Sequence, residues 1–199
     1  MLSPPEIQAS VGGTFALAVA LNLAIQRRRG IRAFVLSADP GRRRLEVVAI
    51  SGLAGWFLAA CTEGLPAVGP RLGPVLLDHA ALDLVGMGCM SVGLAIGLTA
   101  YVHMGRSWRI GIDESVRESL VTHGVFAWSR NPIYLFVDLF AVGVLLASGR
   151  LFFCFGSPLV VLGVHLRILE EERFLERTYE NAFEAYRRRT RRYWGKKAD

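Results

Sequence analysis

Long apolar runs alternate with short basic segments along this 199-residue chain. Five runs are predicted to form helices, at about 7–25, 47–66, 80–102, 132–148 and 151–169. Each run, of about 17–23 residues, is long enough as an α-helix to cross a hydrocarbon core of about 30 Å. The pattern predicts an all-α, polytopic membrane helical bundle with about five transmembrane helices. The second run also fits a shorter, re-entrant segment.

The chain after the fifth run has a different pattern. From Ile168 to Tyr186, apolar residues recur on one helical face, and acids and arginines cover the remainder. We expect a cytoplasmic amphipathic C-terminal helix that lies along the membrane interface or caps the bundle. Pro158, inside the fifth run, predicts a kink. Gly93 and Gly97 in the third run predict a close helix–helix approach.

The distribution of charge predicts the orientation in the membrane. Hydrophobic residues make up 52% of the chain, yet its formal net charge is +6. Every lysine and arginine except Arg71 and Arg150 falls in the first loop, the third loop or the tail. Positively charged loops stay on the cytoplasmic side. We therefore expect an integral membrane protein of a bacterial inner membrane, with its N-terminus outside and its active site and C-terminus cytoplasmic.

The same composition argues against other classes of protein. The arginines flank apolar runs and no nucleic-acid-binding module is visible, so we expect no nucleic-acid partner. The three cysteines lie in three separate apolar runs without any metal-ligand spacing, so we expect no metal site. No glycine-rich dinucleotide fingerprint follows a predicted strand. The partners expected are the lipid bilayer and a lipophilic small molecule.

Polar residues converge where the fourth run begins. Asn131 and Pro132 are typical of the N-cap and first position of a helix. Arg130 then lies at a helix N-terminus, where free N–H groups and the helix dipole favour an anion. Tyr134 and Asp138 follow at i, i+4 spacing and extend one face inward. This convergence predicts a ligand site.

Asp138 lies about 9 Å into the predicted helix. A carboxylate is costly at that depth in a membrane, so it is either functional or paired. The sequence leaves open a role in a substrate site and an internal partner such as Arg109 or His165. His165 itself fits an interfacial hydrogen-bonding residue better than a base.

Three sequence elements, in a specific order and spacing, resemble one known family. The first is Met-Gly-Arg-Ser-Trp at 104–108. The second is Leu-Val-Thr-His-Gly-Val-Phe at 120–126 with Arg-Asn-Pro-Ile-Tyr at 130–134. The third is Glu170-Glu171 with Leu175, followed by Tyr-Glu-Asn-Ala-Phe-Glu-Ala-Tyr at 179–186. Over about residues 80 to 193 the chain resembles the isoprenylcysteine carboxyl methyltransferases, whose wider superfamily includes membrane phospholipid N-methyltransferases.

The chain departs from the family pattern at three positions. Val125 stands for the usual proline, Asn131 for the histidine of the eukaryotic form, and Glu180 for the usual glycine. Asparagine does not titrate, which argues against proton transfer at position 131. Residues 1–78 carry no recognisable motif. We therefore expect one integral-membrane domain, 1–199, with N-terminal helices at 1–78 and a methyltransferase-like core at 79–199.

The resemblance implies an integral membrane methyltransferase that transfers a methyl group from S-adenosylmethionine to a lipophilic acceptor entering from the lipid. It implies cofactor binding on the cytoplasmic side, by the Arg-Asn-Pro region and the Glu-Glu helix. The expected catalytic residues are Arg130, Glu171, Tyr134 and Asp138. The residues expected to bind the cofactor are Trp108, His123, Gly124, Phe126, Arg130, Asn131, Pro132, Tyr134, Glu170, Glu171 and Tyr186.

Physical chemistry suggests how these residues act. Arg130 would pair with the methionine carboxylate of the cofactor and Glu171 with its ammonium. Tyr134 and Trp108 would turn aromatic faces toward the sulfonium or the adenine.

Several acceptors and functions stay open. The acceptor is an isoprenylcysteine carboxylate or thiol, a phospholipid amine or another small lipid, and only an amine has to lose a proton. Two other functions fit the same spans: a non-catalytic small membrane transporter or assembly protein, and a reductase of the sterol-reductase type with a nicotinamide cofactor.

Overall fold

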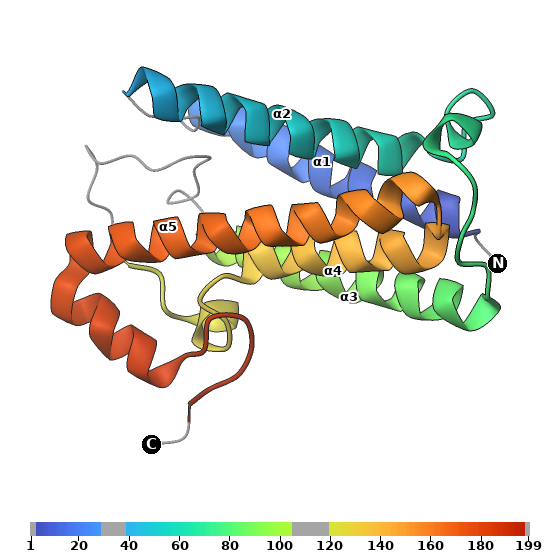
Figure 1. Ribbon diagram of the computed structural model, residues 1–199. Helices are drawn as coiled ribbons and strands as arrows, with labels where there is room; N and C mark the ends of the chain where they lie inside the picture. The colour runs from blue at the N-terminus through green and yellow to red at the C-terminus, as the bar shows by residue number, and fades with distance from the viewer. Residues whose placement is uncertain (1–2, 29–38, 105–119, 198–199) are drawn as a thin grey trace.

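The protein is a bundle of long helices in a computed structural model that describes residues 3–28, 39–104 and 120–197. Its helices in order are α1 (Pro4–Arg28), α2 (Pro40–Thr62), the 3-10 helix η1 (Gly69–Leu72), α3 (Ala80–Met104), the 3-10 helix η3 (Gly124–Ala127), α4 (Pro132–Ser148) and α5 (Leu151–Arg189). The N-terminus and the α4–α5 turn lie at one end of the bundle, and η3 and the C-terminus lie at the other (Figure 1). The predicted all-α fold is confirmed.

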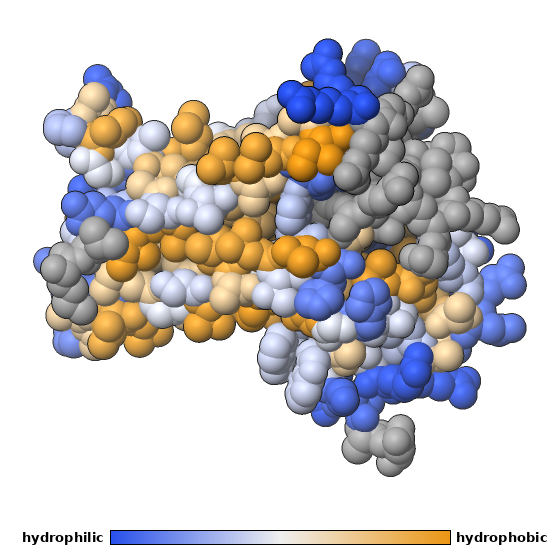
Figure 2. All heavy atoms as spheres, turned by 180° about the vertical axis from the view of Figure 1, so that it is seen from behind, coloured by the Kyte–Doolittle hydropathy of each residue, from blue (hydrophilic) through white to orange (hydrophobic). Residues whose placement is uncertain are grey.

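Four helices, α1, α2, α3 and α5, are long and apolar enough to cross a membrane. The fifth, α4, is also apolar but has 17 residues, which is about 26 Å of helix. The second run forms one continuous helix, which begins and ends earlier than predicted and is not a short re-entrant segment. Figure 2 shows apolar side chains along the flank of the bundle, with the most hydrophilic ones toward the end where α2 begins and the C-terminal segment lies.

The closest helix packing joins α3 to α4. A Cβ atom added to Gly86 would lie 2.6 Å from the carbonyl oxygen of Gly143, and one added to Gly143 would lie 2.6 Å from that of Gly86. Along the same seam Gly93 and Gly97 face Leu139 and Phe136. Small residues let two backbones come this close in a membrane. The predicted close approach is confirmed, and α4 is the partner helix.

The last helix, α5, breaks at a place the sequence did not predict. Its backbone dihedral angles stay helical through Pro158, and its one non-helical residue is Glu180, with φ 42° and ψ −116°. Beyond Glu180 the chain turns back, so that Phe183 and Tyr186 are buried beside η3. The tail is therefore two helical segments and not the one amphipathic helix predicted, and the reversal brings the Tyr186 hydroxyl to the carbonyl of Phe126.

An ion pair between Arg150 and the buried Glu63 holds the end of the bundle where α4 and α5 meet. Glu63, which is 6% exposed, accepts hydrogen bonds from the Ser148 hydroxyl at 2.7 Å and from Arg150 Nε at 2.9 Å. Arg150 also donates to the carbonyl of Gly73. This cluster ties the end of α2 to the α4–α5 turn, and so fixes how α4 and α5 start their antiparallel course.

Candidate functional site

Glu172 is the centre of a buried charged cluster at the N-terminal end of α4. Its Oε1 accepts from Arg130 Nε at 3.1 Å and NH2 at 2.9 Å, and from Asn131 Nδ2 at 3.1 Å. Its Oε2 accepts from Arg192 Nε at 3.0 Å and NH2 at 2.9 Å. Burial alone would raise the pKa of Glu172, but the hydrogen bonds and charges of Arg192 and Arg130 outweigh burial and hold it below its ordinary value. Glu172 is therefore ionised at neutral pH.

The C-terminal segment, 190–197, closes over this cluster. Arg130 donates from NH1 to the carbonyl of Thr190 at 2.6 Å, and its backbone N–H donates to the carbonyl of Arg191. Asn131 Nδ2 donates to the carbonyl of Arg192. The side chain of Asn131 thus spans to the tail and makes no N-cap hydrogen bond, contrary to the prediction. The predicted helix start at Pro132 is confirmed.

A second contact lies beside this cluster on the same helices. The Tyr134 hydroxyl donates to Glu171 Oε2 at 2.7 Å. The other carboxylate oxygen of Glu171 accepts no hydrogen bond among the residues that the structure describes. Burial raises the pKa of Glu171, although the hydrogen bond from Tyr134 and the charge of Arg167 oppose this rise. Glu171 therefore keeps one oxygen available to a cationic ligand.

Arg130 and Glu171, the two residues expected to hold the cofactor, each have a different partner within the protein. Arg130 and Glu171 lie at the same end of the bundle, yet Arg130 binds Glu172 and Glu171 binds Tyr134. Adjacent residues on a helix point about 100° apart. Glu172 therefore holds the buried cluster together, whereas the neighbouring Glu171 accepts a hydrogen bond, among the described residues, only from Tyr134 and keeps its second oxygen open.

Tyr186 and η3 form a buried support behind the cluster. The Tyr186 hydroxyl donates to the carbonyl of Phe126 at 2.7 Å, and both rings are buried. Gly124 has φ 62°, and a Cβ there would lie 2.3 Å from the ring of His103. The ring of His123 lies 5.9 Å from that of His103. Among the residues expected to bind the cofactor, Phe126 and Tyr186 are thus engaged in packing.

One other expected residue makes its contacts elsewhere. Glu170 forms ion pairs with Arg42 and Arg167, on the side facing the start of α2. Trp108 lies outside the described residues, as does Arg109. No group of three His, Cys, Asp or Glu side chains in the described part of the chain is placed to hold a metal ion.

Asp138 lies one helical turn further along α4 than Tyr134, near the pair formed by His165 and Tyr193. Its Oδ1 is buried and has no hydrogen-bond partner. His165 Nδ1 lies 2.5 Å from the Tyr193 hydroxyl. Burial raises the pKa of Tyr193, and the charge of the nearby Asp138 adds to the rise. Of the two internal partners weighed for Asp138, His165 is bound to Tyr193 instead.

Sequence reasoning missed Glu172, Arg192 and Tyr193. All three stand beside residues that were noticed, in the acidic run of α5 and in the basic tail. The run of arginines in the tail carries no sign of which one turns inward. The helical positions of 171 and 172 could have shown that both glutamates, on adjacent faces, meet α4.

The fold and site define a polytopic helical membrane protein with a buried charged cluster around the start of one apolar helix. Residues 82–182 match the family model described as phospholipid methyltransferase. The chain belongs to this family of membrane methyltransferases. No curated protein and no solved structure matches it.

Proposed function

We propose that this protein transfers a methyl group from S-adenosylmethionine to a lipophilic acceptor at the cytoplasmic face of the membrane. The family match supports methyl transfer. The observation that carries the choice of site is the half-buried Glu171, which faces Tyr134 and keeps one carboxylate oxygen free. The basic loops around this end support its cytoplasmic orientation.

The residues present fit such a donor. S-adenosylmethionine supplies a methyl group on a positively charged sulfur, and it also carries an ammonium group. Glu171 can pair with the ammonium, and the Tyr134 ring and hydroxyl lie beside it. Methyl transfer is an in-line displacement, so alignment of the two reactants contributes most of the rate. The protein's task is to hold donor and acceptor on one line.

In this proposal Arg130 does not contact the donor but holds the start of α4 in place. All three of its side-chain nitrogens are engaged, two with Glu172 and one with Thr190. It therefore fixes the start of α4 to the C-terminal segment. Trp108, His123, Gly124, Asn131, Pro132 and Glu170 remain predicted cofactor neighbours on the strength of the family resemblance.

Binding of labelled S-adenosylmethionine to the purified protein in lipid nanodiscs tests this proposal. Glu171→Gln and Tyr134→Phe are expected to weaken binding by about tenfold to a hundredfold, because a hydrogen bond to a charged group contributes about 1.5–3 kcal/mol. Glu176→Gln is the matched control, since Glu176 lies on the same helix but is 52% exposed and pairs with Arg187.

The alternatives give different results. A transporter or assembly protein would not bind the donor at all. A reductase would be protected from heat by NADPH and not by S-adenosylmethionine. Equal binding by the Glu171→Gln and Glu176→Gln variants would place the donor elsewhere.

A further inference from the structure

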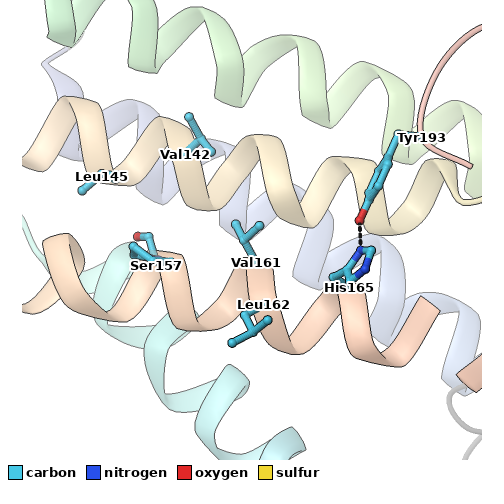
Figure 3. A pocket seen from close by; sticks show the side chains of 8 residues that line it. Val142, Leu145, Ser157, Val161, Leu162, His165 and Tyr193 are labelled. Carbon is cyan, nitrogen blue, oxygen red and sulfur yellow. Dashed lines mark hydrogen bonds between the residues drawn. The ribbon is translucent and has the colours of Figure 1, made fainter. Parts of the chain in front are cut away.

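An apolar groove runs between α4 and α5, and the C-terminal segment reaches it through Tyr193. It encloses about 480 Å³. Its lining residues are Val142, Leu145, Ser157, Pro158, Val161, Leu162, His165 and Tyr193. Figure 3 shows His165 and Tyr193 at one end of the groove, and Ser157 with Leu145 at the other. Val142 and Leu162 are 37% and 54% exposed, so the groove opens sideways, toward the region that lipid would occupy.

The groove is aligned with the proposed donor site. Tyr134, Asp138, Val142 and Leu145 follow one another at helical spacing, so they form one stripe along α4. Tyr134 belongs to the donor site, and Asp138 lies one turn further along. Tyr193 lines the groove, and the charge of Asp138 contributes to the raised pKa of Tyr193. A chain lying in the groove would present its end to Asp138, next to the donor.

The charge at this end selects the kind of group that can bind there. Asp138 Oδ1 is buried without a partner, and no lysine or arginine lines the groove in the described part of the chain. The nearby Arg192 is bound to Glu172, and Arg167 is bound to Glu170. An isolated carboxylate in an apolar setting favours a cation and repels an anion.

A phosphate or carboxylate next to the reacting atom would therefore lack a partner and face Asp138. The groove has one further unpartnered polar atom, Ser157 Oγ, on a side chain that is 1% exposed. A single hydroxyl suits one uncharged oxygen and does not neutralise an anion. The groove is thus suited to a hydrocarbon chain with a basic nitrogen at its end.

We propose that the methyl acceptor is a single-chain lipophilic amine that carries no phosphate, bound with its chain in the α4–α5 groove and its nitrogen at Asp138. This rests on the proposed function above. Asp138 takes a proton from the ammonium, which leaves a neutral amine. The nitrogen lone pair then forms a bond to the methyl carbon as the carbon–sulfur bond breaks. The electron pair of the broken carbon–sulfur bond stays on sulfur. The product is a methylated ammonium, again a cation beside a carboxylate.

Methyl transfer from labelled S-adenosylmethionine to three probes tests the proposal with the whole protein in nanodiscs. The probes are octadecylamine, phosphatidylethanolamine and a farnesylated cysteine carboxylate. We expect kcat/KM for octadecylamine to exceed both others by at least about tenfold, a difference of 1.4 kcal/mol. Preference for either of the two probes that carry a phosphate or a carboxylate would overturn the proposal.

Two variants locate the chain and the nitrogen. Val161→Trp fills the groove and is expected to abolish transfer to octadecylamine, whereas Leu159→Trp, at a position that is 68% exposed on the same helix, retains it. Asp138→Asn is expected to lower kcat for the amine by about 10²–10⁴-fold. Unchanged kcat in Asp138→Asn, or equal rates in the two tryptophan variants, would overturn the proposal.

Donor binding, measured in parallel, distinguishes a failure of the proposed acceptor from a failure of the proposed function. All three variants should bind S-adenosylmethionine as the wild type does. Wild-type protein that binds the donor but methylates no amine would overturn the acceptor and leave the proposed function standing. Failure of the wild type to bind the donor would overturn both.

Discussion

Replacing Glu172 by glutamine should loosen the C-terminal segment from the bundle more than the loss of any other single carboxylate of α5. The carboxylate receives five hydrogen bonds, two from Arg130, two from Arg192 and one from Asn131. A glutamine is nearly the same size, so packing is conserved. Its side chain is neutral, however, and its NH2 group would face donors.

The magnitude follows from burial. The side chains of Arg130 and Glu172 are 6% and 9% exposed. Removing one partner of a buried ion pair typically costs about 3–5 kcal/mol, because the other charge stays buried and unpaired. The bonds from Arg192 add little, since its side chain is 36% exposed and screened by solvent. For a protein of this size, about 3–5 kcal/mol corresponds to a fall in Tm of roughly 6–20 °C.

Thermal unfolding of the purified protein in detergent measures this loss, and limited proteolysis reports whether the C-terminal segment is released first. Glu184→Gln is the control. Glu184 lies on the same helix and also binds two arginines, Arg187 and Arg188, but it is 35% exposed. Its loss should cost at most about 1 kcal/mol. Equal shifts in Tm for the two variants would refute the view that Glu172 holds the site together.

The effect also depends on pH in a defined direction. The pKa of Glu172 is lower in the folded protein than its ordinary value of 4.5. Its contribution is therefore fully present above about pH 4.5 and is lost as the pH falls through the folded pKa. The Tm values of the wild type and Glu172→Gln should converge in acid.

Two further changes test the fold. Glu180→Gly should raise Tm by several degrees, because Glu180 has φ 42°, where a residue other than glycine costs about 1–3 kcal/mol; an unchanged or lower Tm would show that the reversal is not strained. Gly143→Ala should destabilise the protein by about 1–3 kcal/mol, since the new Cβ would lie 2.6 Å from the carbonyl oxygen of Gly86. Gly88→Ala is its control, because a Cβ at Gly88 meets nothing within 4 Å, and equal melting of both variants would contradict the close packing of α3 on α4.

Much of the site was visible as separate pieces of sequence. The start of α4 at Pro132 and the α4–α5 turn at Gly149 follow from local rules on proline and glycine. The pairing of Arg130 does not. Arg130 could pair with any of the three consecutive glutamates at 170–172 in α5. Only the rotation of α5 against α4 selects Glu172.

The sequence by itself determined that this chain is a helical membrane protein, because long apolar runs and an uneven distribution of arginine constrain any fold in a bilayer. It also carried the resemblance to membrane methyltransferases in three short motifs. Only the tertiary structure decided which glutamate is structural and which is open, where α5 reverses, and that an apolar groove lies between α4 and α5. Those features depend on contacts between residues far apart in the chain, and no local pattern encodes which of several similar side chains will meet.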